Sequence, residues 1–76
     1  MQNQIDLKDL IPKLPPLIAR DRVAEYLGGV ISAKTLANLD SLGDGPSGRM
    51  RIGRKIVYRT EDLLEWLEQR SKLLVW

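Results

Sequence analysis

The sequence has no cysteine and no histidine among its 76 residues. Their absence excludes disulfides, thiol nucleophiles and the usual Cys/His zinc sites, and it removes the commonest general base of enzymes. No apolar run approaches the length of a membrane span, and Met1–Gln4 lacks the basic start of a signal peptide. We therefore expect a cytoplasmic protein that is not an enzyme, with no cofactor, no metal and no membrane or small-molecule partner.

A chain of this length forms one small domain, which buries only about 60% of the surface that its unfolded chain exposes. The total stability of such a domain is on the order of 4–11 kcal/mol. One compact core fits into it, but a core together with a deep catalytic cleft does not.

The cations are concentrated in one short segment, although the formal net charge is only +2. Residues 49–59 contain no acid and five cations, Arg49, Arg51, Arg54, Lys55 and Arg59. A directed basic surface on a nearly neutral chain is typical of proteins that bind nucleic acid.

Helical spacing of apolar residues predicts two short helices joined by a glycine turn. The first helix is expected over residues 20–27 and ends at Gly28-Gly29, because glycine suits the left-handed residue that follows a helix. The second helix begins after Ser32, a good N-cap, and ends at Gly43. Two such helices form a helix-turn-helix.

A β-hairpin and a third helix are predicted to follow. Residues 49–52 alternate basic and apolar, residues 55–58 are β-branched and aromatic, and Gly53-Arg54 makes the turn between them. The last helix is expected from Thr60, as N-cap, to residue 71 or 72. The residues expected in the core are Leu36, Leu39, Ile52, Val57 and Trp66, with Val30 and Ile31 between the first two helices.

The predicted fold is mainly α with a small β-hairpin, a winged helix-turn-helix over residues 17–72. Residues 1–16 form an N-terminal arm, in which Pro12 forbids a long regular helix. The chain ends in an apolar tail, Leu73, Leu74, Val75 and Trp76, which is unexpected on a free segment.

In a helix-turn-helix the second helix enters the major groove of DNA. Asn38 is suited to a bidentate pair with an adenine edge, and Lys34 to guanine or phosphate. The hydroxyl groups suit phosphate or adaptable base contacts. The outer face of this predicted recognition helix contains Ser32, Lys34, Thr35, Asn38 and Ser41.

The hairpin would be the wing. We expect Arg54, at its tip, to enter a minor groove, whose narrow walls concentrate negative potential. Arg49, Arg51 and Lys55 are expected mainly at phosphates. Further candidates for contacts to the DNA backbone are Arg20, Arg22 and Arg59.

The glycine turn and the basic hairpin also have purely structural explanations that do not involve DNA. Two helices around a glycine turn are common in small helical domains, and basic residues on a hairpin are often merely solvated or protect an edge strand from aggregation. Both features together, in this order and followed by a capped helix, favour DNA binding.

Five segments in order resemble excisionase-family domains, which are related to the MerR-like winged helices. The family patterns are A-A-E-Y-L-G, S-x-x-T-L, G-x-G-P, R-I-G-R-x-V-x-Y-R and E-D-L-x-x-W-L. This chain has VAEYLG at 23–28, SAKTLAN at 32–38, GDGP at 43–46, RIGRKIVYR at 51–59 and EDLLEWL at 61–67. The resemblance covers about residues 17–70.

The resemblance implies a recombination directionality factor from a bacterium, phage or integrative element. Such a protein binds repeated sites in double-stranded DNA cooperatively, bends the DNA and directs a tyrosine integrase toward excision. Small AlpA-like transcriptional regulators have the same domain. The tail 73–76 and the arm are candidates for self-association on DNA or for integrase contact, or they cover the small core.

Three functions are therefore compatible with the sequence. The first is an excisionase, and the second is a small transcriptional regulator of the same fold that acts at a promoter. The third is a protein-interaction module, such as an anti-repressor, that does not bind DNA.

Overall fold

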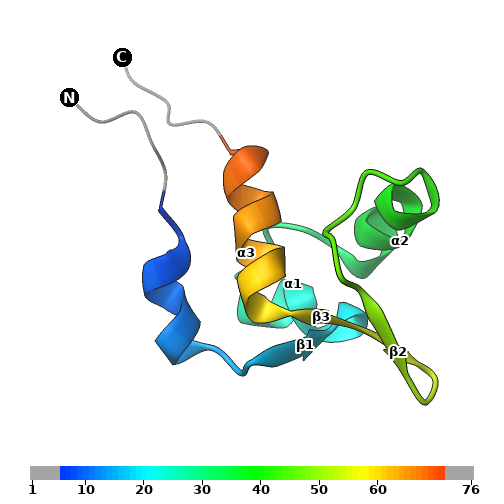
Figure 1. Cartoon of the computed structure of the whole chain (residues 1–76), viewed down its shortest axis with the longest axis horizontal. Helices are drawn as coiled ribbons and strands as arrows, with labels where there is room; N and C mark the ends of the chain where they lie inside the picture. Colours follow the sequence, from blue (N-terminus) through cyan, green and yellow to red (C-terminus); the bar gives the residue numbers. More distant parts are fainter. Residues whose placement is uncertain (1–5, 72–76) are drawn as a thin grey trace.

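The computed structural model describes residues 6–71 of the chain. They form an α+β domain of short helices and a small antiparallel sheet (Figure 1). No helix in this described part is long and apolar enough to cross a membrane. In chain order the elements are the 3-10 helix η1 (Lys8–Lys13), β1 (Leu17–Ala19), the 3-10 helix η2 (Arg20–Arg22), α1 (Val23–Tyr26), α2 (Ala33–Ser41), β2 (Met50–Ile52), β3 (Lys55–Arg59) and α3 (Thr60–Gln69).

The sheet has the order β1-β3-β2, with β3 at its centre. The predicted hairpin is confirmed: β2 and β3 pair antiparallel, and Ile52 lies opposite Lys55 beside the turn. Gly53 occupies this turn at φ 62°, a conformation that glycine adopts at no steric cost. The strand β1 was not predicted. It pairs with the other edge of β3, where Leu17 lies opposite Arg59.

The core lies where the sheet meets the helices. Every element except η1, η2 and β2 contributes a buried side chain to it, and the expected burial of Leu36, Val57 and Trp66 is confirmed. Leu39 and Ile31 are partly buried and pack against this cluster. The buried cluster consists of Ile18, Val23, Leu36, Tyr58, Leu63 and Trp66.

Two residues that were expected in the core are exposed instead. Ile52 is 52% exposed because it lies at the hairpin turn, beyond the part of the sheet that the helices cover. Val30 is 72% exposed, and it follows the two left-handed glycines of the α1–α2 turn, while its neighbour Ile31 reaches the core.

The predicted helix ends are partly right. Ser32 caps α2 as expected, since its Oγ accepts a hydrogen bond from the Thr35 N–H at 3.1 Å. The first helix starts as the 3-10 helix η2, because its N-cap Ala19 has no side-chain acceptor for the free N–H groups. The N-cap of α3 is Arg59 rather than Thr60, whose buried hydroxyl donates to the Pro15 carbonyl. This last helix ends at Gln69, earlier than predicted.

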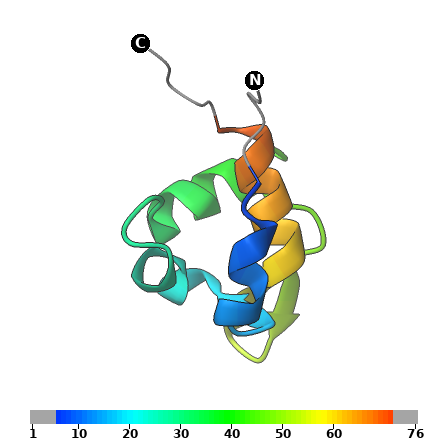
Figure 2. The same cartoon turned by 90° about the vertical axis from the view of Figure 1, so that its left-hand side faces the viewer.

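The N-terminal arm packs on the domain as far as it is described. Its helix η1 lies beside α3 in both views (Figures 1 and 2), and the Leu7 N–H donates to the Glu68 carboxylate. The predicted apolar tail, 73–76, lies outside the described residues.

Candidate nucleic-acid interface

The two elements with predicted DNA contacts, α2 and the β2–β3 hairpin, lie on one side of the molecule, away from η1 (Figure 1). A shallow cleft of about 390 Å³ separates them. Its walls include Ala33, the first residue of α2, and Arg54 and Lys55 from the hairpin. The cleft therefore lies between the start of α2 and two of the predicted wing residues.

Two side chains on the outer face of α2 remain available. Lys34 and Asn38 are exposed, and their spacing of four residues places them on the same helix face. Among residues 6–71 neither side chain forms an ion pair or a side-chain hydrogen bond. They present one ammonium group and one amide to solvent, the two groups that the sequence assigned to base and phosphate contacts.

The hydroxyl groups predicted on this face are engaged locally. The Ser32 Oγ caps the helix and also lies 3.0 Å from the Thr35 Oγ1, to which it donates. The Ser41 hydroxyl donates to the Asn38 carbonyl at 2.9 Å. These bonds engage hydroxyl groups at the two ends of α2, whereas the side chains of Lys34 and Asn38 have no internal partner among residues 6–71.

On the hairpin, Arg51 and Arg54 are exposed and form no ion pair within the described part of the chain. Arg51 lies on β2, and Arg54 lies in the turn between the strands. Neither guanidinium has an internal carboxylate to neutralise it. Both are therefore available to an external anion.

Three further predicted cations have acidic neighbours, of which Asp21 and Glu25 are exposed and Asp62 is partly buried. The pairs are Lys55–Asp21, Arg22–Glu25 and Arg59–Asp62. The hydrogen bond from Lys55 lowers the pKa of Asp21, and the hydrogen bond to Glu25 raises the pKa of Arg22. Because exposed ion pairs add little to stability, an arriving phosphate can displace the carboxylate from Lys55 or from Arg22.

Arg20 and Arg49 are placed differently, since both contact Asp40. Arg20, a predicted contact to the DNA backbone, directs its Nη2 to the Asp40 Oδ2 at 2.5 Å, and its side chain is 23% exposed. Arg49, a predicted wing contact, donates to the Asp40 backbone carbonyl at 3.3 Å and lies 3.5 Å from its Oδ1. Arg20 has a structural role, whereas the half-exposed Arg49 has both an internal contact and a solvent face.

The Asp40 carboxylate is the centre of a buried polar network. The Tyr58 hydroxyl donates to its Oδ2 at 2.5 Å, and the Arg20 Nε donates to the same hydroxyl at 2.9 Å. Burial and the bond to Asp40 raise the pKa of Tyr58. Burial opposes the charge of Arg20, but its bonds to Tyr58 and Asp40 outweigh this effect and raise its pKa. The network joins α2 to η2, to β3 and to the segment that leads into the hairpin.

Loop packing explains why residue 45 is glycine. A Cβ at Gly45 would lie 1.9 Å from the Asp40 Oδ1, so this loop closes directly over the carboxylate. The Oδ1 is buried and accepts no hydrogen bond from the described residues. The Arg49 Nη1 lies 3.5 Å from this oxygen.

Sequence reasoning missed Asp40, although a signal was present. Asp40 lies four residues after the core residue Leu36, which places it on the buried face of α2. An acid on that face requires a partner, because a buried charge is costly unless it is paired. Arg20 and Tyr58 could not be identified as its partners without the fold.

The chain was also compared with known proteins. No model of a protein family matches the sequence, and no curated protein matches it.

Proposed function

We propose that this protein binds double-stranded DNA as a winged helix-turn-helix, with α2 as recognition helix and the β2–β3 hairpin as wing. One observation carries the proposal. Lys34, Asn38, Arg51 and Arg54 are exposed, have no internal charge or side-chain hydrogen-bond partner in the described part of the chain, and come from two elements on one side of the molecule. No catalytic step is part of this function.

The size of α2 suits the major groove. Its nine residues correspond to about 13–14 Å of helix, and the groove of B-DNA is wide enough to admit one helix. In this arrangement the Asn38 amide reads an adenine edge, while Lys34 contacts a guanine or a phosphate. The Ser32 cap and the hydrogen bond from the Ser41 hydroxyl to the Asn38 carbonyl stabilise both ends of the helix without an external partner.

The hairpin contacts the adjacent backbone. Arg54 in the turn enters the minor groove and Arg51 binds phosphate, since guanidinium groups pair well with both. Lys55 and Arg59 exchange their carboxylate partners, Asp21 and Asp62, for neighbouring phosphates. The buried Asp40 network fixes the angle between α2 and the hairpin, so that both reach DNA together.

Within this function we propose the role of an excisionase, on the strength of the five ordered segments that resemble that family. A single winged module buries only about 600–1,000 Å² on DNA, so occupancy at a specific site requires neighbouring copies. Cooperative binding to tandem sites beside an attachment site, with a tyrosine integrase as partner, meets that requirement. A footprint confined to a promoter would instead assign the chain to the transcriptional regulators.

The test is a gel shift of the full chain on random duplex DNA and on DNA from upstream of its own gene, across a salt series. Three to five phosphate contacts predict a slope of log K against log[salt] of about −3 to −5. Ladders of discrete bands on the upstream DNA are expected from cooperative binding. Absence of any shift at low salt would contradict the proposal and favour a protein-interaction module.

A further inference from the structure

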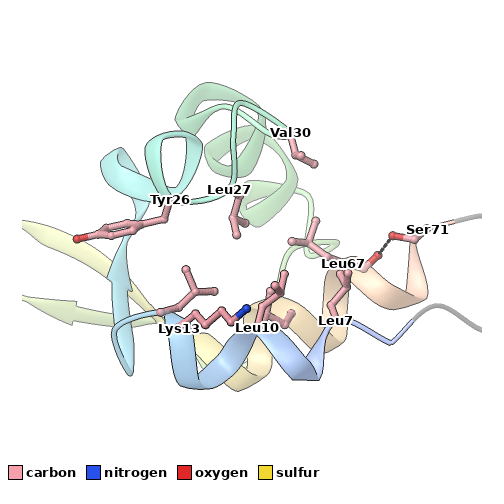
Figure 3. A pocket seen from close by; sticks show the side chains of 10 residues that line it. Leu7, Leu10, Lys13, Tyr26, Leu27, Val30, Leu67 and Ser71 are labelled. Atoms are coloured by element: carbon pink, nitrogen blue, oxygen red, sulfur yellow. Dashed lines mark hydrogen bonds between the residues drawn. The ribbon is translucent and has the colours of Figure 1, made fainter.

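An apolar groove lies between η1, the α1–α2 turn and α3 (Figure 3). It has a volume of about 530 Å³. In Figure 3 the side chains of η1 line one wall, Tyr26, Leu27 and Val30 line the opposite wall, and Leu67 and Ser71 lie at one end. The apolar residues that line it include Leu7, Leu10, Tyr26, Leu27, Val30 and Leu67.

Exposed apolar side chains gather at this groove. Among the described residues, six large hydrophobic side chains are exposed, and Leu10, Tyr26 and Val30 line the groove. An apolar concavity of this kind marks a surface that another apolar group covers. Its volume falls within the usual range for pockets that enclose a ligand of several apolar groups, about 300–1,000 Å³.

We propose that the groove is filled by the segment Leu73–Trp76 of the same chain. Ser71, the last described residue, itself lines the groove, and its hydroxyl donates to the Leu67 carbonyl at 2.5 Å. This bond, drawn in Figure 3, fixes the point from which the tail departs. Only Lys72 separates it from four consecutive apolar residues.

The length of the tail suits this position. Four extended residues span up to about 14 Å, which exceeds the diameter of one helix, about 10–12 Å. Docking within one chain is favoured over docking between copies, because a segment tethered at the groove has an effective local concentration of about millimolar.

Docking of the tail is independent of the proposed DNA contacts. The groove lies beside η1, and α2 and the hairpin lie on the other side of the molecule (Figure 1). The tail then completes the core of a domain that is too small to bury its apolar surface otherwise. Variants of the tail are expected to change thermal stability and to leave the slope of DNA affinity against salt unchanged.

A double-mutant cycle in the full-length chain tests the proposal. The tail variant replaces Leu73, Leu74, Val75 and Trp76 with Ser, and the groove variant is Val30→Asn. Leu42→Asn is the matched control, because Leu42 is also 72% exposed and does not line the groove. The measurement is the unfolding temperature Tm by circular dichroism.

The tail variant is expected to lower Tm by about 5 °C or more. Val30→Asn is expected to lower Tm when the natural tail is present and to have little effect when the tail is serine. Leu42→Asn should have the same effect with either tail. Equal effects of Val30→Asn with both tails would overturn the proposal.

Nuclear Overhauser contacts identify the occupant directly. Contacts between the Trp76 indole and the methyl groups of Leu10 or Leu27 are expected within one molecule. The measurement uses an equal mixture of isotope-labelled and unlabelled chains, filtered for contacts between molecules. Contacts only between molecules would assign the groove to a second copy, and absence of both kinds would leave the tail outside it; either result overturns the proposal.

Discussion

Arg20, which contacts α2 through Asp40, lies in a different environment from Arg51 and Arg54 on the hairpin. Arg20 lies against the buried Asp40 and the Tyr58 hydroxyl, whereas Arg51 and Arg54 extend into solvent without an internal partner in the described chain. A count of cations along the sequence treats all of them as equivalent. Their internal partners divide them into residues that build the fold and residues that are free to bind.

The Asp40 network and the hairpin also differ in how much the loss of a charged side chain changes the folding free energy. Loss of one member of a buried pair leaves an uncompensated charge, which costs about 3–5 kcal/mol of folding free energy. Loss of an exposed, unpaired cation changes stability by no more than about 0.5 kcal/mol. Stability and DNA affinity should therefore respond to separate sets of substitutions.

The largest effect is expected from Asp40→Ala. It leaves Arg20 without its carboxylate and removes the acceptor of the Tyr58 hydroxyl. We expect the free energy of unfolding to fall by about 3 kcal/mol, a large part of a total on the order of 4–11 kcal/mol. Urea denaturation followed by circular dichroism measures this change. Asp44→Ala is the matched control, since it removes an exposed acid, and a similar loss in both variants would contradict the role of the network.

The double variant Arg51→Ala/Arg54→Ala should give the converse result. We expect at least about tenfold weaker DNA binding and a salt slope smaller by about 1–2, because the phosphate contact of Arg51 and the minor-groove cation Arg54 are both lost. The free energy of unfolding should stay within about 0.5 kcal/mol. Fluorescence anisotropy with labelled duplex measures the affinity.

The charge-matched control for this variant is Lys8→Ala/Lys13→Ala. It also removes two exposed cations, but from η1 on the other side of the molecule. Its affinity and salt slope should be close to those of the wild type. Equal weakening in the two variants would show that net charge, and not the hairpin, determines binding.

Asn38→Ala separates base reading from general affinity. We expect the preference for a specific site over random DNA to fall by about 1–3 kcal/mol, the usual contribution of a bidentate base contact. Binding to random duplex should change less. Competition of the two DNAs in the anisotropy assay measures the preference, and equal weakening on both would refute the base-reading role.

The smallest effect is expected from alkaline pH. Burial and the bond to Asp40 raise the pKa of Tyr58 in the folded chain above its ordinary value near 10. Between the unfolded and folded pKa values the unfolded chain loses this proton while the folded chain keeps it, so the free energy of unfolding falls as pH rises through that window. Below the unfolded pKa this contribution is fully present.

The variant Tyr26→Phe isolates this titration, because it leaves Tyr58 as the single tyrosine of the chain. The phenolate absorbance of the folded variant should rise at higher pH than that of the urea-unfolded variant. Coincidence of the two titration curves would show that the network does not hold the Tyr58 proton.

Local signals predicted α2 and the hairpin well. Ser32 marks the start of α2 as its N-cap, and Gly43, which has a left-handed conformation, follows its end. Each of these signals depends on a single residue and can be recognised in the sequence. Alternation and the glycine turn likewise predicted β2 and β3. Alternation did not reveal that Ile52 lies beyond the core, because burial depends on what covers the sheet.

Pairings distant in sequence could not be predicted. Residues 17–19 form a strand because they pair with β3. They are only three residues long and follow Pro15-Pro16, so the sequence itself shows no strand pattern there. The partners of Asp40 lie 20 and 18 residues away, on η2 and β3. The carboxylate partners of Arg20 and Lys55 lie 20 and 34 residues away, whereas Arg22 and Arg59 pair locally with acids three residues further along the chain.

The most direct test of DNA binding through α2 and the hairpin is a titration of the ¹⁵N-labelled chain with duplex DNA, followed by amide chemical shifts. The largest shifts are expected at Lys34, Asn38, Arg51 and Arg54, with small shifts along η1. Shifts concentrated on η1 and α3, or no shifts at low salt, would contradict it.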